Sequence, residues 1–189
     1  EGNGHYEEGW LEDAESESSM NTIMERGGRV KNLYGPSGNK ISYYQINATF
    51  FSALGENEQK LLLARAIQMF MPGIPQVWYL DIFSGKNNYE AADNGGSAGH
   101  KEINRTALSM NDIEEGLKRE VVKKQLEIIR LRNTSDAFSG VVEINDSTDD
   151  ILDIKWTNGA SIAHLIANLN NKGFTIKLTE NEITTTKSY

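Results

Sequence analysis

The chain has 189 residues, a formal net charge of −8 and no cysteine. This length allows one medium domain or two small ones, and it excludes a complete (β/α)8 barrel, which needs about 250 residues. The absence of cysteine excludes a disulfide framework and a cysteine-based zinc site.

The negative charge is concentrated near the amino terminus. Residues 1–20 contain seven Asp or Glu side chains and no Lys or Arg, so the other 169 residues sum to −1 (−8 less −7). A nearly neutral body has no basic field for nucleic acid and no polybasic patch for anionic lipid. No apolar run approaches 18 residues, and the acidic amino terminus is unlike a signal peptide. We therefore expect a cytoplasmic protein with no nucleic-acid partner and no membrane segment.

The first 47 residues show little regular periodicity. Residues 1–19 are acidic and rich in Ser, which is typical of a flexible arm. Residues 20–47 contain the turn-forming run Gly35-Pro36-Ser37-Gly38 and are typical of a long surface loop. Because such long loops are unusual unless they are functional, we expect binding residues on this one.

A helix and a buried strand follow. Residues 58–71 place Leu, Ile, Ala, Met and Phe on one broad helical face. Pro72-Gly73 ends the helix, because proline cannot continue its hydrogen-bond ladder. Residues 74–80 are apolar on both faces apart from Gln76, as in a parallel strand that is covered on both sides. This order predicts one helix-and-strand step of a (β/α) barrel.

The next segment, residues 81–107, is rich in Gly and Asn and is expected to be irregular. Ser109 and Asp112 have the spacing of a capping box, so they predict the start of a helix that runs to about residue 132. Gly116 weakens the first turns of this helix and can split it.

Apolar and polar residues alternate after Gly140 and predict a small antiparallel sheet. The expected strands are residues 141–144, 151–157, 161–168, 174–179 and 182–187. The change of period from helical to alternating places a domain boundary near residue 137.

Residues that usually carry nucleophilic, zinc or dinucleotide chemistry are not suitably arranged. His5, His100 and His164 lack metal-ligand spacing. The glycine-rich runs lack the Lys-Ser/Thr pair of a P-loop, and there is no Gly-x-Ser-x-Gly elbow. We therefore expect no metal and no cofactor.

Two segments carry residue types that suit sugars and phosphate. These are Tyr43, Tyr44, Gln45 and Asn47 on the first loop, and Lys101, Glu102, Asn104 and Arg105 on the second. Aromatic faces and planar amide or guanidinium groups suit a hydroxyl-rich ring, and Lys and Arg suit phosphate. Since Tyr and Asn are common on loops, these types alone do not distinguish a sugar site from an ordinary surface.

Longer runs of sequence resemble one enzyme family. They are YQINATFFSALG at 44–55, ARAIQ at 64–68, PGIPQVWY at 72–79 and EINR at 102–105. From about residue 20 to about residue 140 the chain resembles the sucrose phosphorylases, which are α-amylase-type glycoside hydrolases. The resemblance implies an α/β fold, with the carboxy-terminal part of a (β/α)8 TIM barrel at 20–137 and a small antiparallel β domain at 138–189. The arm at 1–19 precedes both.

The resemblance also implies a retaining reaction. One carboxylate attacks the anomeric carbon, a glutamic acid protonates the leaving group, and phosphate then takes the glucosyl group as α-glucose 1-phosphate. Both carboxyl groups are expected upstream of this region, so we assign no catalytic residue to the chain. The implied partners are a sugar substrate, inorganic phosphate and the missing amino-terminal half of the barrel, without which the chain is expected to be inactive.

Motif positions imply substrate-binding roles for five residues: Ser42, Tyr44, Gln45, His100 and Lys101. Tyr44 and Gln45 match a Tyr-Gln pair beside the acceptor site. Ser42 stands where an aspartate is usual, and Lys101 stands where an arginine is usual. The replacement of an acid by Ser42 and the placement of His100 beside Lys101 make the site less negative, which favours a phosphorylated or carboxylated acceptor over fructose. In this respect the chain is similar to the sucrose 6-phosphate phosphorylase branch, with the glucosylglycerate and glucosylglycerol phosphorylases as neighbours.

Two other interpretations stay open. The first is a non-catalytic carbohydrate-binding module on the carboxy-terminal sheet, which requires a row of exposed aromatic rings. Beyond residue 140 the aromatic residues are Trp156, Phe174 and Tyr189. The second is the obligate half of a split amylase-type enzyme, whose other chain carries the carboxylates.

Overall fold

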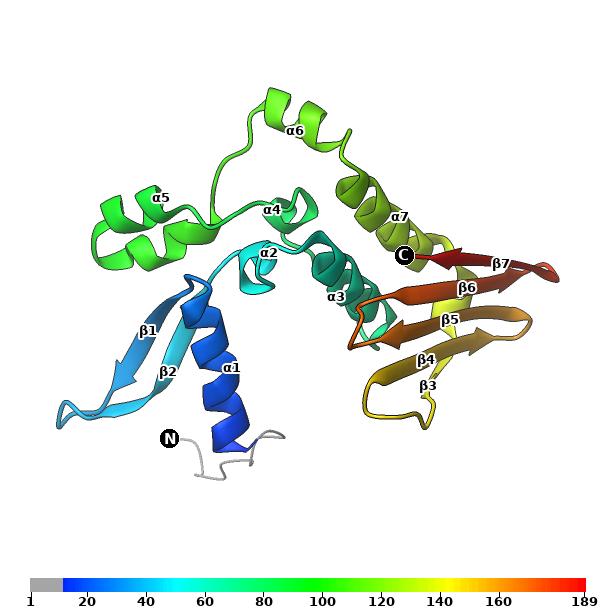
Figure 1. Cartoon of the computed structure of the whole chain (residues 1–189), viewed down its shortest axis with the longest axis horizontal. Coiled ribbons are helices and arrows are strands. Elements are labelled where there is room, and N and C mark those ends of the chain that lie inside the picture. The colour runs from blue at the N-terminus through cyan, green and yellow to red at the C-terminus, as the bar shows by residue number, and fades with distance from the viewer. Residues whose placement is uncertain (1–11) are drawn as a thin grey trace.

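The computed structural model describes residues 12–189, apart from the side chains of residues 13, 33 and 40–44. Figure 1 shows a helix and a long hairpin at one side of the molecule, a helical middle, and a sheet near the carboxy terminus at the other side. The sheet packs against two of the middle helices, α3 and α7.

Helix α1 spans Asp13–Glu25. Residues 13–19 are therefore helical, whereas the sequence predicts a flexible arm there; residues 1–11 lie outside the described residues. The Glu15 carboxylate accepts a hydrogen bond from the backbone N–H of Glu12 at 3.0 Å. Acidic side chains near a helix amino terminus also favour the helix, because they complement its dipole. The acidic composition that is typical of a flexible arm thus supports the first turn of α1 instead.

Residues 29–47 form an antiparallel hairpin of β1 (Arg29–Tyr34) and β2 (Lys40–Asn47). The expectation of a long irregular loop over residues 20–47 is therefore wrong. The run Gly35-Pro36-Ser37-Gly38 is the turn of this hairpin, where the N–H of Gly35 donates to the carbonyl of Asn39 at 2.8 Å. Gly38 has a φ of +78°, a conformation that glycine adopts without steric cost. The sequence thus predicts the turn residues but not the two strands that they connect.

Helix α3 confirms the predicted helix over residues 58–71. It spans Glu58–Phe70 and follows the short helix α2 (Phe50–Ala53). The side chain of Asn57 caps it by accepting from the backbone N–H of Lys60 at 2.9 Å. Gly73, with a φ of +99°, turns the chain after the helix.

The predicted strand over residues 74–80 is absent from the described structure. The segment is irregular and ends in the short helix α4 (Tyr79–Ile82). A strand exists only where a neighbouring strand accepts and donates its backbone hydrogen bonds, and none lies beside this segment in the described chain. Three of its apolar side chains are open to solvent, with Ile74, Trp78 and Tyr79 93%, 49% and 37% exposed, whereas Leu80 is buried.

Residues 81–107, expected to be irregular, are partly helical, with α5 (Tyr89–Asn94) followed by the 3-10 segment η1 (Gly96–Asn104). The predicted helix after Ser109 is present and is split near Gly116 into α6 (Met110–Gly116) and α7 (Glu120–Thr134). A side chain at Gly116 would meet the Phe83 ring, because a Cβ there lies 2.5 Å from a ring carbon. The absence of a side chain at Gly116 therefore lets the Phe83 ring approach the backbone.

The carboxy-terminal sheet confirms the five predicted strands. Its order is β3-β4-β5-β6-β7, with each neighbour antiparallel, and the 3-10 turn η2 (Asp136–Ser139) leads into it. The strands are β3 (Val141–Ile144), β4 (Ile151–Asn158), β5 (Ser161–Asn168), β6 (Phe174–Glu180) and β7 (Ile183–Ser188).

One face of this sheet and helices α3 and α7 share a single core. The most deeply buried members from both parts include Leu61, Phe70, Ile128, Ile154 and Leu165. Burial of an aliphatic or aromatic side chain stabilises a fold by about 1.5–3 kcal/mol, so this shared core ties the sheet firmly to the helices. Within residues 12–189, none of the helices has the length and apolarity to cross a bilayer.

Candidate functional site

The structure brings the two segments with predicted site residues together. Ser42, Tyr44 and Gln45 lie on β2, and His100 and Lys101 lie in η1. Both strands of the hairpin contact η1, so segments from distant parts of the sequence meet at one seam, which we call the hairpin seam. The side chains of Ser42 and Tyr44 lie outside the part of the chain that the structure describes.

One face of β1 is turned toward the helices across the seam. The guanidinium of Arg29 lies 3.1 Å from the Asp93 carboxylate and 5.6 Å from the centre of the Tyr89 ring. Lys31 is two residues further along, and side chains two apart in a strand point to the same face. Its partner in the register is Gln45 on β2, which shares this face.

Among the described side chains of β2 and η1, three polar atoms are buried without a hydrogen-bond partner. They are Oε1 of Gln45, Nδ2 of Asn47 and Nε2 of His100, and none has a hydrogen bond to a described residue. Asn47 is only 4% exposed. Since buried polar groups in folded proteins are nearly always hydrogen-bonded, these atoms indicate a place for water or a polar ligand.

The seam is electrostatically positive around His100. Partial burial of the ring lowers the pKa of His100 below its usual value, and the charges of Lys31, Lys101 and Arg105 lower it further. His100 is therefore neutral at pH 7 and can donate from one ring nitrogen and accept at the other. An anionic group placed here would be favoured by the neighbouring cations.

The base of the hairpin is held by side chains from the following loops. The Asn87 side-chain oxygen accepts from the backbone N–H of Thr49 at 2.7 Å, and the Asp81 carboxylate accepts from that of Phe50 at 2.8 Å. Asn104 donates to the carbonyl of Ala48 at 3.3 Å. These bonds fix the residues that directly follow β2, so they determine how the hairpin is presented to η1.

Sequence reasoning missed Lys31, Asn87 and Asp81 as parts of this region. The alternation of Arg29 and Lys31 with Val30 and Asn32 is a weak strand pattern that could have pointed to Lys31. Nothing in the local sequence indicates that Asn87 or Asp81 caps a segment more than 30 positions earlier, because that contact depends on the fold.

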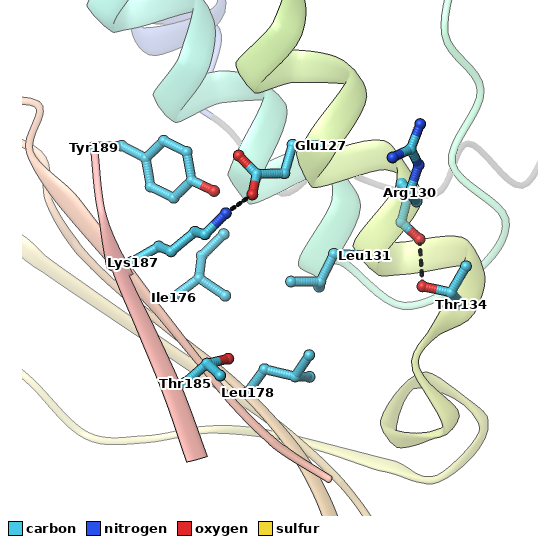
Figure 2. Close-up of a pocket in the computed structure, with 9 residues that line it drawn as sticks. All are labelled: Glu127, Arg130, Leu131, Thr134, Ile176, Leu178, Thr185, Lys187 and Tyr189. Carbon is cyan, nitrogen blue, oxygen red and sulfur yellow. Dashed lines mark hydrogen bonds and ion pairs between the residues drawn. The ribbon is translucent and has the colours of Figure 1, made fainter. Parts of the chain in front are cut away.

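A separate cavity of about 250 Å³ lies between α7 and strands β6 and β7, away from the hairpin seam. Figure 2 shows its apolar floor of Leu131, Ile176 and Leu178, with an ion pair of Glu127 and Lys187 at one end. None of the five predicted site residues lines it. Its mainly apolar floor offers few groups for a sugar, so we place the candidate site at the seam.

Two further sequence expectations concern other kinds of site. Trp156 and Phe174 are buried, at 5% and 3% exposed, so the sheet does not present them as a platform for a carbohydrate. Across residues 12–189, no group of three His, Cys, Asp or Glu residues could hold a metal ion.

Comparison with known proteins gives several close relatives, although no protein-family model matches the chain. The sucrose 6(F)-phosphate phosphorylase of Ilumatobacter coccineus is 58% identical over 89% of this chain and 32% of its own length. The sucrose phosphorylase of Streptococcus mutans is 37% identical over 92% of this chain and 36% of its own length.

A solved structure agrees with these relatives. The sucrose 6F-phosphate phosphorylase from Thermoanaerobacter thermosaccharolyticum superposes with a TM-score of 0.88 and 31% identity, over 96% of this chain and 37% of that one. The fold and the sequence thus define the class as that of the phosphorylase enzymes. Within this class, the chain belongs to the sucrose phosphorylase family. It spans about a third of the length of the relatives that it matches.

Proposed function

We propose that the chain supplies the acceptor-binding part of a retaining glucoside phosphorylase. The whole enzyme would convert sucrose or sucrose 6-phosphate and inorganic phosphate into α-glucose 1-phosphate and fructose or fructose 6-phosphate. The observation that carries this proposal is the hairpin seam, where Gln45, His100 and Lys101 lie on elements that contact each other in a chain of this family.

The reaction proceeds by double displacement. A carboxylate oxygen attacks the anomeric carbon and breaks its bond to the fructosyl oxygen, which takes a proton from the acid. An oxygen of phosphate then attacks the same carbon and displaces the carboxylate, so the anomeric configuration is retained. We assign both carboxyl groups to the part of the enzyme that lies outside this chain. The role of this chain is to bind the group that alternates between fructose and phosphate.

The exposed apolar side chains in the segment after α3, residues 74–80, support a position of this segment in a barrel. Ile74, Trp78 and Tyr79 are 93%, 49% and 37% exposed, although they stand in a run typical of a buried parallel strand. In a closed barrel a strand has neighbours on both sides, and these would satisfy its backbone and cover such side chains. We infer that the remainder of a longer enzyme supplies those neighbours.

The charge of the seam supports a phosphorylated acceptor. Lys31, Lys101 and Arg105 all act on His100, and Ser42 adds no negative charge. A phosphate ester brings two negative charges that such a site stabilises, whereas fructose brings none. We therefore propose that sucrose 6-phosphate is preferred to sucrose.

A chimeric enzyme tests this function. The corresponding third of the Ilumatobacter coccineus relative would be replaced by this chain, and release of glucose 1-phosphate would be measured with each sugar and inorganic phosphate. We expect the chimera to act on sucrose 6-phosphate with a kcat/KM at least about tenfold above that for sucrose, and the chain alone to be inactive.

Each contrary result has a defined meaning. A chimera that is monodisperse and has native circular dichroism, yet releases no glucose 1-phosphate from either sugar, would overturn the proposed function. Equal use of both sugars would overturn the acceptor preference alone. Activity of the isolated chain would show that it carries catalytic carboxylates.

A further inference from the structure

The described part of the chain contains two Asn-Gly pairs, Asn94-Gly95 at the end of α5 and Asn158-Gly159 at the end of β4. An asparagine that precedes glycine loses its side-chain amide in water more readily than other asparagines do. We infer that Asn94 is a site of this spontaneous modification in the folded protein, whereas the fold protects Asn158. The inference concerns the peptide chemistry of this chain and does not rest on the proposed function.

The modification is an intramolecular substitution. The backbone nitrogen of the glycine attacks Cγ of the asparagine side chain, and the bond between Cγ and the amide nitrogen breaks. That nitrogen takes up the proton of the attacking N–H and leaves as ammonia, so a cyclic succinimide remains. Water then opens the ring, giving either aspartate or isoaspartate, in which the main chain is one carbon longer. Glycine favours the attack because it has no Cβ to restrict the backbone.

The structure leaves the reacting groups of Asn94 free. Asn94 is the last residue of the six-residue helix α5, and both Asn94 and Gly95 are exposed. Neither the side chain of Asn94 nor the backbone N–H of Gly95 has a hydrogen bond to a described residue. The ends of helices fray at little cost in free energy, so the backbone here can reach the geometry that the attack requires.

The second pair is equally exposed but is held in place. Asn158 pairs with Ser161 in the ladder of β4 and β5, and Gly159, with a φ of +58°, forms the tight turn between them. The side-chain amide of Asn158 also donates to the backbone carbonyl of Asp136 at 3.0 Å. These bonds must open before Gly159 can attack, and the loss of even one net hydrogen bond slows the reaction about tenfold.

Modification of Asn94 would affect the hairpin seam. The preceding residue, Asp93, lies 3.1 Å from Arg29 of β1. The following residue, Gly95, packs so closely on η1 that a Cβ there would lie 2.5 Å from the Cα of Gly99. Isoaspartate inserts a carbon into the main chain between these two contacts. Because packed segments do not absorb extra atoms without moving, β1 and η1 would shift relative to each other.

The rates at the two pairs test the inference within one molecule. The chain would be incubated in mildly alkaline buffer, with and without urea, and the peptides that contain Asn94 and Asn158 would be followed by mass spectrometry. We expect Asn94 in the folded chain to react within about threefold of its rate in urea. Asn158 should react about tenfold or more slowly in the folded chain than in urea.

Two results would overturn the inference. One is a reaction at Asn94 that folding slows as much as it slows Asn158. The other is a reaction at Asn158 that is as fast in the folded chain as in urea. Asn94→Ser removes the amide and should abolish the modification at this pair while that at Asn158 is unchanged.

A second measurement tests the effect on the seam. The isoaspartate form would be separated by ion exchange, and its His100 ring signals would be compared by NMR with those of the unmodified chain. Asn94→Asp is the matched control, because it adds the same charge without the extra carbon. We expect the His100 signals to move in the isoaspartate form and to stay in place in Asn94→Asp. Signals that are unchanged in both, or equally moved in both, would refute the proposed displacement.

Discussion

Trp156 donates its indole N–H to the backbone carbonyl of Phe70 at 2.7 Å, across 86 positions of sequence. This bond joins β4 of the sheet to the last turn of α3. Arg132 reinforces the same junction, because its guanidinium lies 4.8 Å from the Trp156 ring and donates to the carbonyl of Gly73 at 2.8 Å. The sheet thus fixes the turn at Gly73, after which the exposed apolar segment of residues 74–80 begins.

Trp156→Phe should destabilise the protein by about 2 kcal/mol. Phenylalanine keeps an aromatic ring in the core, but the buried carbonyl of Phe70 loses its donor, and an unsatisfied buried acceptor costs about 1–3 kcal/mol. The free energy of unfolding in urea measures the effect. Trp78→Phe is the control, because its indole N–H bonds at a half-exposed position, and it should change stability by less than about 1 kcal/mol. Equal losses in the two variants would contradict the argument.

Gln125→Leu should destabilise the protein by about 2–3 kcal/mol. Arg65 is 1% exposed and donates from Nε to the Gln125 side chain at 3.0 Å. Burial lowers the pKa of Arg65, and removal of the acceptor leaves a buried charge less well paired. The double variant Arg65→Met with Gln125→Leu removes both polar groups, so urea unfolding should find it more stable than Gln125→Leu alone. A double variant less stable than the single one would refute this account.

Asp153→Asn should lower stability at neutral pH and have little effect in acid. Partial burial tends to raise the pKa of Asp153, but hydrogen bonds from His164 at 2.7 Å and from Asn145 outweigh it, so the pKa is lowered. A carboxyl group whose pKa is lower in the folded state stabilises the fold above its unfolded pKa, and that contribution is lost as the pH falls through the folded pKa. The difference from wild type should be about 0.5–1 kcal/mol above pH 5 and should shrink as the pH falls below the ordinary pKa of an Asp side chain.

Urea unfolding as a function of pH measures this difference. Asp149→Asn, in the exposed connection between β3 and β4, is the matched control and should change the free energy of unfolding by less than about 0.5 kcal/mol. A difference between Asp153→Asn and wild type that stays constant as the pH falls through the acid range would show that the pair does not stabilise the fold through its charge.

Gly99→Ala should disturb the candidate site without touching a ligand group. A Cβ at Gly99 would lie 2.1 Å from the backbone carbonyl oxygen of Ala92, so α5 and η1 would have to separate. Forcing extra atoms into a packed position costs about 1–3 kcal/mol, and here it also moves the adjacent His100. Urea unfolding and the NMR shift of the His100 ring measure the two effects. Ala98→Ser, at the neighbouring exposed position, should leave the stability and the His100 shift unchanged. If Gly99→Ala also left both unchanged, the close approach of Gly99 to the Ala92 carbonyl would be refuted.

Local patterns predicted much of the carboxy-terminal half. The strands after Gly140 were expected within one or two residues of their observed ends, since alternation and turn residues such as Asn158-Gly159 act over a few positions. The helix over 58–70 and the break near Gly116 have the same local origin. Local patterns failed at residues 29–47 and 74–80, because whether an extended segment is a strand depends on its neighbours.

By itself, the sequence determined the family, the residue types of the site and the elements whose period and caps are local. It also predicted substrate-binding roles for Gln45, His100 and Lys101, although it placed them on separate loops. Only the tertiary structure brought β2 against η1 and set Lys31 opposite Gln45. Likewise, only the fold buried Trp156 in the core rather than on a surface. The physical reason is that burial and charge at a site arise from contacts between distant segments, and these contacts leave no period in the sequence.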